Sequence, residues 1–327
     1  MDIDWNRFCN MIKSHENFVL VSHIRPDCDA LGSELGMAGV LRALGKKVRI
    51  VNGQETPPNL SFIDPQNEIL AINHSVKPED LADADCILIL DTSAKAQLGD
   101  MFPVIQSSSA HKAILDHHVS DDEIGAEVFK RTTAEATGTL VVEAAEKLGV
   151  TITKEIAVPL FAAIATDTGW FRFGSVTDYT YETIAKLLRA GVVPADVYGK
   201  LYERETLGRV RLRGVVLERI ETELDGRLAH TYILKEDYER TGALPSDTED
   251  LINNALAIKG TEFAVIMVGQ LGGGFKISFR SRCHVACNEV AGNFGGGGHK
   301  AAAGAFIDGE FEAVRDQLLS YVRDALS

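Results

Sequence analysis

A histidine and two aspartates follow the first strongly apolar segment of the chain, spaced four and then two residues apart. They are His23, Asp27 and Asp29. Residues 18–21 before them have the pattern of a buried strand, and residues 30–44 after them that of a helix. Pro26 disfavours helical geometry at Arg25, so we expect a turn that can fold the three side chains around one cation. Carboxylates with one imidazole suit Mn²⁺, Mg²⁺ or Fe²⁺ better than a metal that prefers thiolates.

Three other apolar segments also end at ionisable residues. These residues are Asp91, the run Asp116, His117 and His118, and Asp167. The carboxyl ends of the strands in an open parallel α/β sheet share one crevice, where ligands bind. Four segments that bring histidine and aspartate to one crevice outline a site for two metal ions. For Asp167 a second interpretation stays open, because a helix running from Thr153 through Ala165 would also end just before it.

The segments that must position these side chains alternate between strands and helices. Further strands are expected at residues 48–51, 86–90 and 113–115, and further helices at residues 5–15, 134–148 and 179–190. This alternation predicts an α/β fold with a parallel, doubly wound sheet. The rest of the chain predicts a smaller α/β domain. Its strands are expected at residues 227–234, 263–270, 275–280 and 305–307, and its helices at residues 247–258, 283–293 and 310–326.

Length and composition limit the function classes. A chain of 327 residues suits two domains, which we place at residues 1–191 and 215–327, with a helical connector at residues 192–214. No apolar run approaches the roughly 20 residues of a membrane span, and the first residues carry no signal-peptide pattern. Five cysteines, an odd number, fit a reducing compartment. We therefore expect a cytoplasmic protein without a membrane partner.

The formal net charge of −14 bears on the partners. A protein that grips long nucleic acid by its phosphates usually has a basic surface, so long duplex nucleic acid is not expected. Short oligoribonucleotides or nucleotides, held by metals and a local basic pocket, fit this charge better. A homodimer stays open.

The motifs together resemble a known family. The segment from His23 to Asp29, the strand-ending Asp91, the run 116–118 and Asp167 are similar to the four motifs of the DHH phosphoesterase superfamily. Residues 278–281, Ser-Phe-Arg-Ser, and the glycine-rich run 295–304 resemble the associated DHHA1 domain, a smaller mixed-sheet α/β domain. Order and length most resemble the NrnA-like branch, whose members are oligoribonucleases and 3′-phosphoadenosine-5′-phosphate phosphatases.

The resemblance implies a ligand set for two divalent cations, most often Mn²⁺, with Mg²⁺ or Fe²⁺ as alternatives. The first metal would take His23, Asp27 and Asp91. The second would take Asp29, Asp91, His117 and Asp167, so that Asp91 bridges the pair. Two cations roughly 3.5–4 Å apart polarise a shared water and stabilise the oxygens of an in-line displacement at phosphorus.

Asp116 and His118 do not fit as direct ligands. Asp116 is expected to orient an imidazole. His118 is either a buried core histidine or, as we favour, a contact to the scissile phosphate that protonates the leaving oxygen. Arg25 is a further candidate for a phosphate contact.

The glycine run allows two interpretations. It could be a flexible linker, or its backbone N–H groups could approach a phosphate closely. The resemblance places the nucleotide end away from the metals on this region, with Arg280 as its arginine. The candidates are Arg280, Gly296, Gly297, Gly298 and His299.

The sequence thus predicts a metal-dependent phosphoesterase, and the resemblance implies two overlapping activities. One trims short oligoribonucleotides, including linear dinucleotides, to 5′-mononucleotides, and the other removes the 3′-phosphate from 3′-phosphoadenosine-5′-phosphate. The alternatives are an inorganic pyrophosphatase and a RecJ-like single-strand exonuclease. From a different class, the protein could only bind a nucleotide and signal, which the loss of a metal ligand would favour. No ligand of the motif set is missing.

Overall fold

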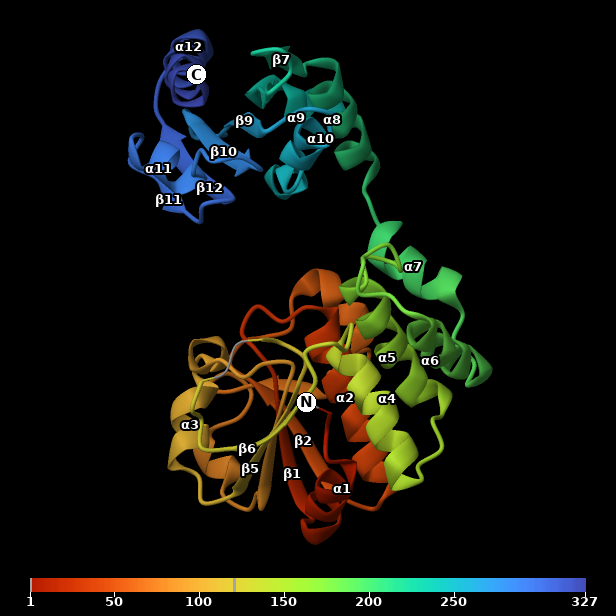
Figure 1. Cartoon of the computed structure of the whole chain (residues 1–327). Coiled ribbons are helices and arrows are strands. Elements are labelled where there is room, and N and C mark those ends of the chain that lie inside the picture. The colour runs from red at the N-terminus through yellow and green to blue at the C-terminus, as the bar shows by residue number, and fades with distance from the viewer. Residues whose placement is uncertain (1, 120–121) are drawn as a thin grey trace. The chain divides into compact units, whose positions relative to one another are not determined.

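The computed structural model describes residues 2–119 and 122–327, and the chain divides into two compact units, Met1–Glu203 and Arg204–Ser327 (Figure 1). Segment 192–214, predicted as a connector, contains helix α7 (Pro194–Tyr202) and the first part of α8 (Leu207–Glu218). No helix of the described residues combines the length and the apolar character that crossing a membrane requires.

The first unit contains the predicted parallel sheet. Its strands are β1 (Asn17–Val21), β2 (Lys47–Asn52), β3 (Ile69–Ala71), β4 (Cys86–Leu90), β5 (His111–Asp116) and β6 (Glu127–Lys130), in the order β3-β2-β1-β4-β5-β6. Every pairing is parallel. From the central pair, β1 and β4, the strand order runs outward in opposite directions. Such a switch point opens a crevice at the carboxyl ends of the two strands.

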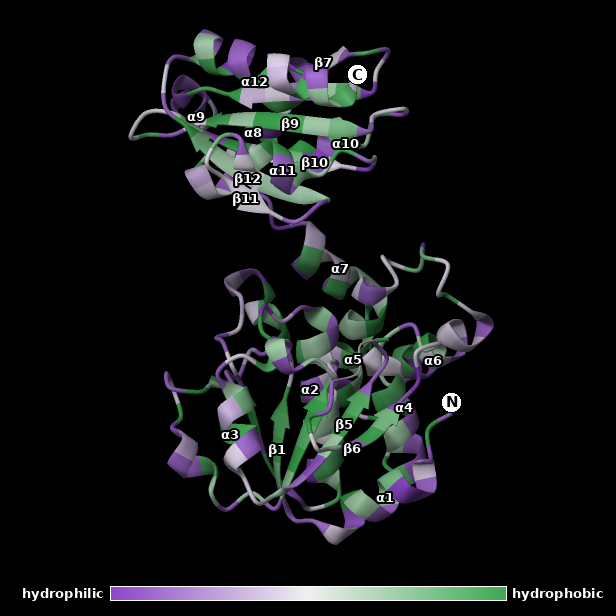
Figure 2. Cartoon of the chain, turned by 60° about the vertical axis from the view of Figure 1, so that its left-hand side comes forward, coloured by the Kyte–Doolittle hydropathy of each residue, from purple (hydrophilic) through white to green (hydrophobic). Residues whose placement is uncertain are grey.

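Helices cover both faces of this sheet, which explains why its strands are apolar without alternation. They are α1 (Trp5–Ser14), α2 (Cys28–Ala43), α3 (Met101–Ser107), α4 (Thr137–Leu148), α5 (Lys154–Asp167) and α6 (Asp178–Arg189), with 3₁₀ turns at Pro58–Ile63, Pro78–Leu81 and Lys95–Leu98. Phe18 and Leu20 of β1 pack in the core under α1, α2, α4 and α5, and Val19 and Val21 pack on the side of α3. The two layers are visible on either side of the sheet (Figure 1), and its strands are mainly apolar (Figure 2).

Helices α2 and α5 pack unusually closely, and this contact sets the spacing of the site. A Cβ at Gly32 would collide with the Pro159 carbonyl oxygen, and one at Gly36 with the Leu160 side chain. The close approach brings the start of α2, with Asp29, to the end of α5, with Asp167. The helical interpretation of the segment before Asp167 is therefore confirmed.

The second unit is a mixed sheet. Its strands are β7 (Glu221–Glu223), β8 (Leu228–Ile233), β9 (Phe263–Gly269), β10 (Phe275–Ser281), β11 (Gly297–Gly298) and β12 (Ala302–Ile307), in the order β11-β12-β10-β9-β8-β7. Only β8 and β9 pair in parallel. One face packs on α11 (Cys287–Gly292) and α12 (Phe311–Leu326), and the other on α8, α9 (Lys235–Thr241) and α10 (Ile252–Leu256). The predicted fold class is confirmed for both units.

Three element predictions are wrong in their extent. The helix predicted over residues 247–258 is a 3₁₀ turn at Pro245–Thr248 followed by α10, because Asp250 has a positive φ of 61° that interrupts it. The helix predicted from residue 283 begins only at Cys287, since the Ser281 hydroxyl donates a hydrogen bond to the Val285 carbonyl oxygen and holds a bend there. The helix predicted from residue 134 begins at Thr137, a shift that matters for the site.

Candidate metal centre

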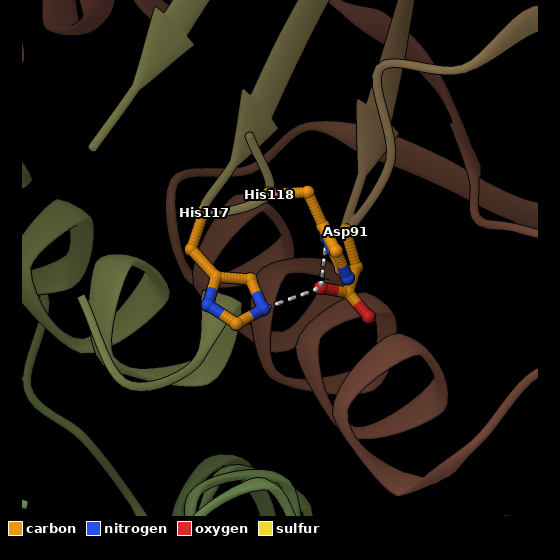
Figure 3. Close-up of side chains that lie close together, drawn as sticks. All are labelled: Asp91, His117 and His118. Carbon is orange, nitrogen blue, oxygen red and sulfur yellow. Dashed lines mark ion pairs between the residues drawn. The ribbon is translucent and has the colours of Figure 1, made fainter. Parts of the chain in front are cut away.

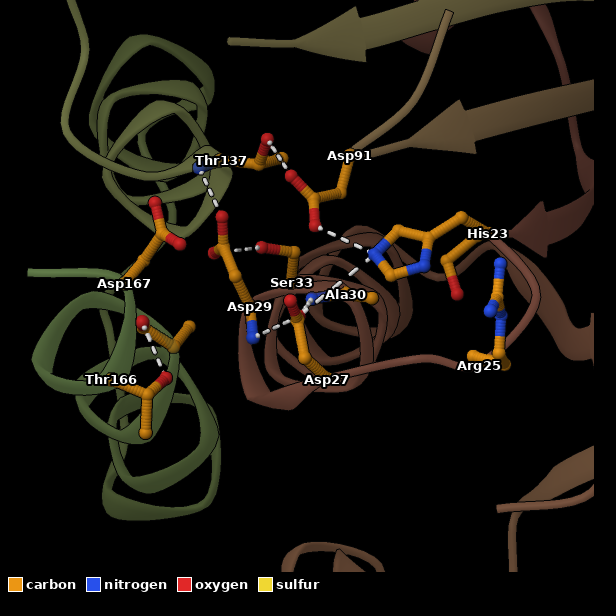
Figure 4. Close-up of polar contacts among 12 residues, drawn as sticks. His23, Arg25, Asp27, Asp29, Ala30, Ser33, Asp91, Thr137, Thr166 and Asp167 are labelled. Atoms are coloured by element: carbon orange, nitrogen blue, oxygen red, sulfur yellow. Dashed lines mark hydrogen bonds and ion pairs between the residues drawn. The ribbon is translucent and has the colours of Figure 1, made fainter. Parts of the chain in front are cut away.

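Six ionisable side chains meet at the carboxyl end of the central strand pair. They come from the turn after β1, the first turn of α2, the residue after β4, the residue after β5 and the last residue of α5, and they are His23, Asp27, Asp29, Asp91, His117 and Asp167. Figure 4 shows five of them facing one another. The predicted ligand residues are thus brought together, at the switch point where a ligand is expected.

The first group contains His23, Asp27 and Asp91. His23 Nε2 lies 3.4 Å from Asp91 Oδ2 and 3.9 Å from Asp27 Oδ1. Asp27 caps α2, accepting the N–H groups of Asp29 and Ala30 at 2.9 and 3.1 Å. The capping bonds fix its carboxylate at the edge of the cluster, where 61% of the side chain is exposed.

The second group contains His117, Asp29 and Asp167. His117 Nε2 lies 3.7 Å from Asp29 Oδ2 and 3.6 Å from Asp167 Oδ2. It also lies 3.5 Å from Asp91 Oδ1. Asp91 therefore turns one oxygen toward His23 and the other toward His117, which is the arrangement of a carboxylate shared by two metal positions.

Both histidines are oriented by backbone carbonyls. His23 Nδ1 lies 3.0 Å from Ile24 O, and His117 Nδ1 lies 3.1 Å from Ala134 O. A carbonyl can only accept, so each Nδ1 carries a proton and each Nε2 faces the carboxylates. This is the usual preparation of a metal-binding imidazole.

The charges of the cluster also fit a cation. Burial lowers the pKa of His23, but the hydrogen bond to Asp91 and the charges of Asp91 and Asp27 together outweigh it and raise that pKa to about 9. Burial and the charges of Asp91 and Asp167 raise the pKa of Asp29 well above its usual range. Burial, with Asp91 and Asp27, also raises the pKa of Asp167. A divalent cation can replace the extra protons that such crowded carboxylates hold. The donor set of carboxylate oxygens and imidazole nitrogens suits Mn²⁺ or Mg²⁺.

Helix α4 supports the cluster in a way that sequence reasoning missed. Asp29 accepts the N–H groups of Thr137 and Gly138 at 2.7 and 2.8 Å, and Thr137 Oγ1 donates to Asp91 Oδ1 at 2.8 Å. These are free N–H groups of a helix start, which favour a negative charge. The predicted start at residue 134 placed Thr137 inside the helix, where its N–H would have had a partner.

Asp116 orients His118, as predicted for its role. Asp116 Oδ1 accepts the backbone N–H of His118 at 3.0 Å and lies 2.9 Å from His118 Nδ1, and Ser93 Oγ donates to the other oxygen. Asp116 is fully buried, whereas the His118 side chain is 48% exposed. His118 is therefore not a core histidine. The hydrogen bond from Asp116 raises the pKa of His118, and the ring stands beside Asp91 and His117 (Figure 3).

A hollow of about 300 Å³ opens beside the first group of ligands. We call it the metal hollow, and its lining residues are His23, Asp27, Asp91, Thr92, Ala94, Gln97 and His118. His118 thus lies on the same hollow as three candidate ligands. A phosphate in this hollow would have His118 as a nearby hydrogen-bond donor.

Comparison with known proteins agrees with this geometry. Residues 17–164 match the DHH family, N-terminal domain, and residues 225–327 match the DHHA1 domain. The chain is 31% identical over 309 residues to the bifunctional oligoribonuclease and PAP phosphatase NrnA of Thermus thermophilus, covering 94% of this chain and 90% of that protein. The chain belongs to the NrnA-like branch of the DHH family. It is a hydrolase that acts on phosphoester bonds.

Solved structures of DHH relatives have the same fold. An exopolyphosphatase-related protein from Bacteroides fragilis superposes with a TM-score of 0.78 at 28% identity, over 99% of this chain and 97% of that one. The exonuclease RecJ, solved bound to manganese, superposes with a TM-score of 0.53 at 14% identity, over 100% of this chain and 95% of that one. These comparisons show the shared fold, and the donor set of the cluster itself suits a divalent cation.

One buried acid of this DHH protein was not singled out from sequence. Glu34, in the middle of α2, is fully buried, and burial raises its pKa to about 8. Its Oε2 accepts from Asn52 Nδ2 at 2.9 Å, and Asn52 Oδ1 accepts the Ser22 N–H at 2.9 Å. Ser22 precedes His23, so this chain of bonds holds the turn that presents the first ligand. A glutamate inside an otherwise apolar helix was the available signal.

The predicted substrate residues of the DHHA1 unit lie in the half of its sheet formed by β11, β12 and β10 and in the turn between β11 and β12. Arg280 of β10 pairs with Ala302 of β12, and His299 donates its N–H to Ala302 O at 2.8 Å. The Arg280 guanidinium lies 4.0 Å from Asp250 and lines a hollow of about 190 Å³ with Lys276 and others. Arg280 and the His299 turn are therefore neighbours within the unit.

The glycine run is not a linker, because Gly297 and Gly298 form β11 against β12. A Cβ at Gly296 would collide with Gly304 O, and one at Gly298 would lie 2.6 Å from Ala303 Cα. Close strand packing thus requires glycine at both positions. Gly297 has open space beside it, so it alone of the three is unconstrained by packing and free to face a ligand.

Proposed function

We propose that this protein is a divalent-metal phosphoesterase that hydrolyses short oligoribonucleotides to 5′-mononucleotides and removes the 3′-phosphate from 3′-phosphoadenosine-5′-phosphate. The observation that carries the proposal is Asp91, whose two carboxylate oxygens face His23 and His117. The name of the Thermus relative supports the two substrate classes. The acidic net charge favours short substrates over long ones.

The two ligand groups would hold two cations, with Mn²⁺ as the ion we propose. One group is His23, Asp27 and Asp91, and the other is Asp29, Asp91, His117 and Asp167. Bound there, the cations would supply Lewis acidity to a water molecule and to the phosphoryl oxygens. The carboxylates fix the position of the reacting phosphate, and Thr137 and the start of α4 keep Asp29 and Asp91 from turning away.

His118 acts on the leaving group. Its Nδ1 proton is held by Asp116, so its Nε2 is the atom that can donate to the departing oxygen. That hydrogen bond raises the pKa of His118, which favours the protonated ring that a general acid needs. Arg280, Gly297 and His299 bind a part of the substrate that does not react, and Arg25 lies at the rim of the catalytic unit as a further cation.

Removal of the metal tests the function. Protein treated with EDTA is expected to release no mononucleotide from a linear dinucleotide and no phosphate from 3′-phosphoadenosine-5′-phosphate. Addition of Mn²⁺ should restore both activities, because the carboxylates and imidazoles of the cluster cannot themselves supply the Lewis acidity of the cations. The measurement is kcat/KM for both substrates and for pyrophosphate, in a series of divalent ions. Pyrophosphate as the best substrate would point instead to the pyrophosphatase alternative, and no hydrolysis of any of them would refute the proposal.

Arg280→Ala tests selection by the second unit. Loss of one charge-assisted hydrogen bond costs roughly 1.5–3 kcal/mol, so kcat/KM for a dinucleotide is expected to fall about ten- to a hundredfold. A small activated phosphodiester that reaches only the metal hollow cannot use Arg280. The ratio of the two kcat/KM values is therefore expected to fall by the same factor.

Arg315→Ala is the matched control, since Arg315 is an arginine of α12 in the same unit that pairs only with its neighbour Asp316 among the ion pairs of the described residues. Its ratio should equal that of the wild type. A uniform loss on both substrates by Arg280→Ala, with an unchanged melting temperature, would show that Arg280 supports the fold or the metal centre instead.

A further inference from the structure

A second hollow of about 480 Å³ lies next to the metal hollow, and we call it the side hollow. Its lining residues are Arg25, Pro26, Asp27, Cys28, Gln54, Glu55, Pro57, Asn59, Leu60, Thr166 and Leu201. All of them belong to the first unit. Asp27 lines both hollows, so a molecule bound in one can extend past Asp27 into the other. In Figure 4 the labelled members Arg25, Asp27 and Thr166 lie on the side of the cluster away from Asp91 and Thr137.

The side hollow has apolar walls with polar groups at its rim. Pro57 and Leu60 come from the loop after β2, and Leu201 comes from α7. The amides of Gln54 and Asn59 add hydrogen-bonding groups. Gln54 Oε1 accepts the Arg25 N–H at 2.8 Å, so the group that Gln54 can offer a ligand is its Nε2 donor. Apolar faces with a few amide groups are typical of pockets for flat heterocycles.

The charges argue against a second phosphate in this hollow. Its ionisable lining is one cation, Arg25, and two carboxylates, Asp27 and Glu55. Asp27 is assigned to a cation, and Arg25 and Glu55 offset each other. The lining therefore offers a second phosphate no excess positive charge, whereas an uncharged ring needs none. A nucleobase is joined to its own 5′-phosphate through one sugar. A base in the side hollow therefore fits a phosphate in the metal hollow, with the sugar passing Asp27.

We propose that the side hollow binds the nucleobase of the nucleotide whose phosphate is hydrolysed, and that Leu60 is a specificity-determining residue. This inference rests on the function proposed above. Its consequence is that the catalytic unit itself distinguishes nucleotide phosphoesters from small phosphoesters, without any contribution from Arg280. The wall formed by Leu60 and Pro57 packs on the base, and the Gln54 and Asn59 amides meet its edge.

The test compares two p-nitrophenyl phosphodiesters that share a leaving group, one carrying uridine at its 5′ oxygen and the other a methyl group. With Mn²⁺ the wild type is expected to favour the uridine ester in kcat/KM by about tenfold or more, as a filled apolar pocket allows. Leu60→Trp fills the side hollow, so the ratio of the two values should fall to near one. Leu60→Ala introduces no bulk that could disturb the fold, and it should lower the ratio several-fold by removing one wall of the hollow.

Ser61→Trp is the matched control, because Ser61 is exposed on the same 3₁₀ turn and is not part of the lining. Its ratio should equal that of the wild type. A wild type that hydrolyses both esters equally well overturns the inference, and so does a parallel loss on both esters in both Leu60 variants. A wild type that hydrolyses neither ester and also fails to hydrolyse a linear dinucleotide or 3′-phosphoadenosine-5′-phosphate refutes the proposed function instead. Binding in the side hollow is then tested separately by the rise in melting temperature that uridine 5′-monophosphate causes. Leu60→Trp should abolish this rise, and an unchanged rise in Leu60→Trp would overturn the inference.

Discussion

Asp91→Ala is expected to lower turnover by several orders of magnitude while the fold survives. Asp91 is the carboxylate that both ligand groups share, so its loss removes a contact from each metal position at once. The predicted readouts are kcat with saturating Mn²⁺ and the Mn²⁺ stoichiometry of the purified protein. Turnover close to that of the wild type in saturating Mn²⁺ would remove Asp91 from the site.

The effect of Asp91→Ala on the melting temperature should differ from its effect on turnover. Asp91 is buried beside Asp29 and Asp167, and its charge contributes to the raised pKa of both. Without cations, removal of this charge relieves the repulsion from Asp29 and Asp167 but also removes the contacts of Asp91 with His23 and Thr137. The melting temperature in EDTA should therefore change little. The increase in melting temperature on addition of Mn²⁺ should be lost.

The backbone at Asp91 decides which second variant to make. Asp91 has a positive φ of 63°, a conformation that asparagine tolerates better than alanine. Asp91→Asn therefore tests the charge without added strain. Asp64→Ala is the control for loss of a buried aspartate, since Asp64 is 5% exposed and accepts the N–H groups of Glu68 and Ile69 away from the cluster. It should lower stability and leave turnover per folded molecule unchanged.

The convergence of the candidate metal residues could be predicted from sequence because each lies next to a long apolar segment. An apolar segment followed by an acid is a local pattern, and parallel topology then brings the strand ends together. Asp167, for which a strand and a helix both stayed open, ends helix α5, yet it reaches the same crevice because α5 packs on α2.

The supporting residues could not be predicted in this way, because their roles depend on partners distant in sequence. Thr137 supports Asp29 across 108 residues, and this contact exists only because α4 begins at that residue. Glu34 supports the turn before His23 through its hydrogen bond with Asn52, at the end of the neighbouring strand β2. In the second unit, the requirement for Gly296 and Gly298 follows from the pairing of β11 with β12, which the sequence did not indicate.

His118→Ala and His117→Ala are expected to fail for different reasons. His117 Nε2 faces three carboxylates, so its loss should weaken Mn²⁺ binding. His118 is tied to Asp116, and its replacement should leave Mn²⁺ binding intact while kcat falls about 10²–10⁴-fold, the usual contribution of a general acid. Isothermal titration with Mn²⁺ and single-turnover rates separate the two effects. Equal loss of Mn²⁺ in both variants would show that His118 is a ligand.

The pH profile identifies the proton that His118 supplies. A general acid must be protonated, so wild-type kcat should fall as the pH rises through the pKa of His118, which the hydrogen bond from Asp116 raises above its ordinary value. Asp116→Asn removes the charge behind that shift, and the fall should then begin at a lower pH. His118→Ala should lack this fall altogether. A substrate with an activated leaving group, which needs no proton, should lose far less activity in His118→Ala than a dinucleotide does. If both substrates lose activity equally, His118 orients the phosphate through a hydrogen bond instead of protonating the leaving oxygen.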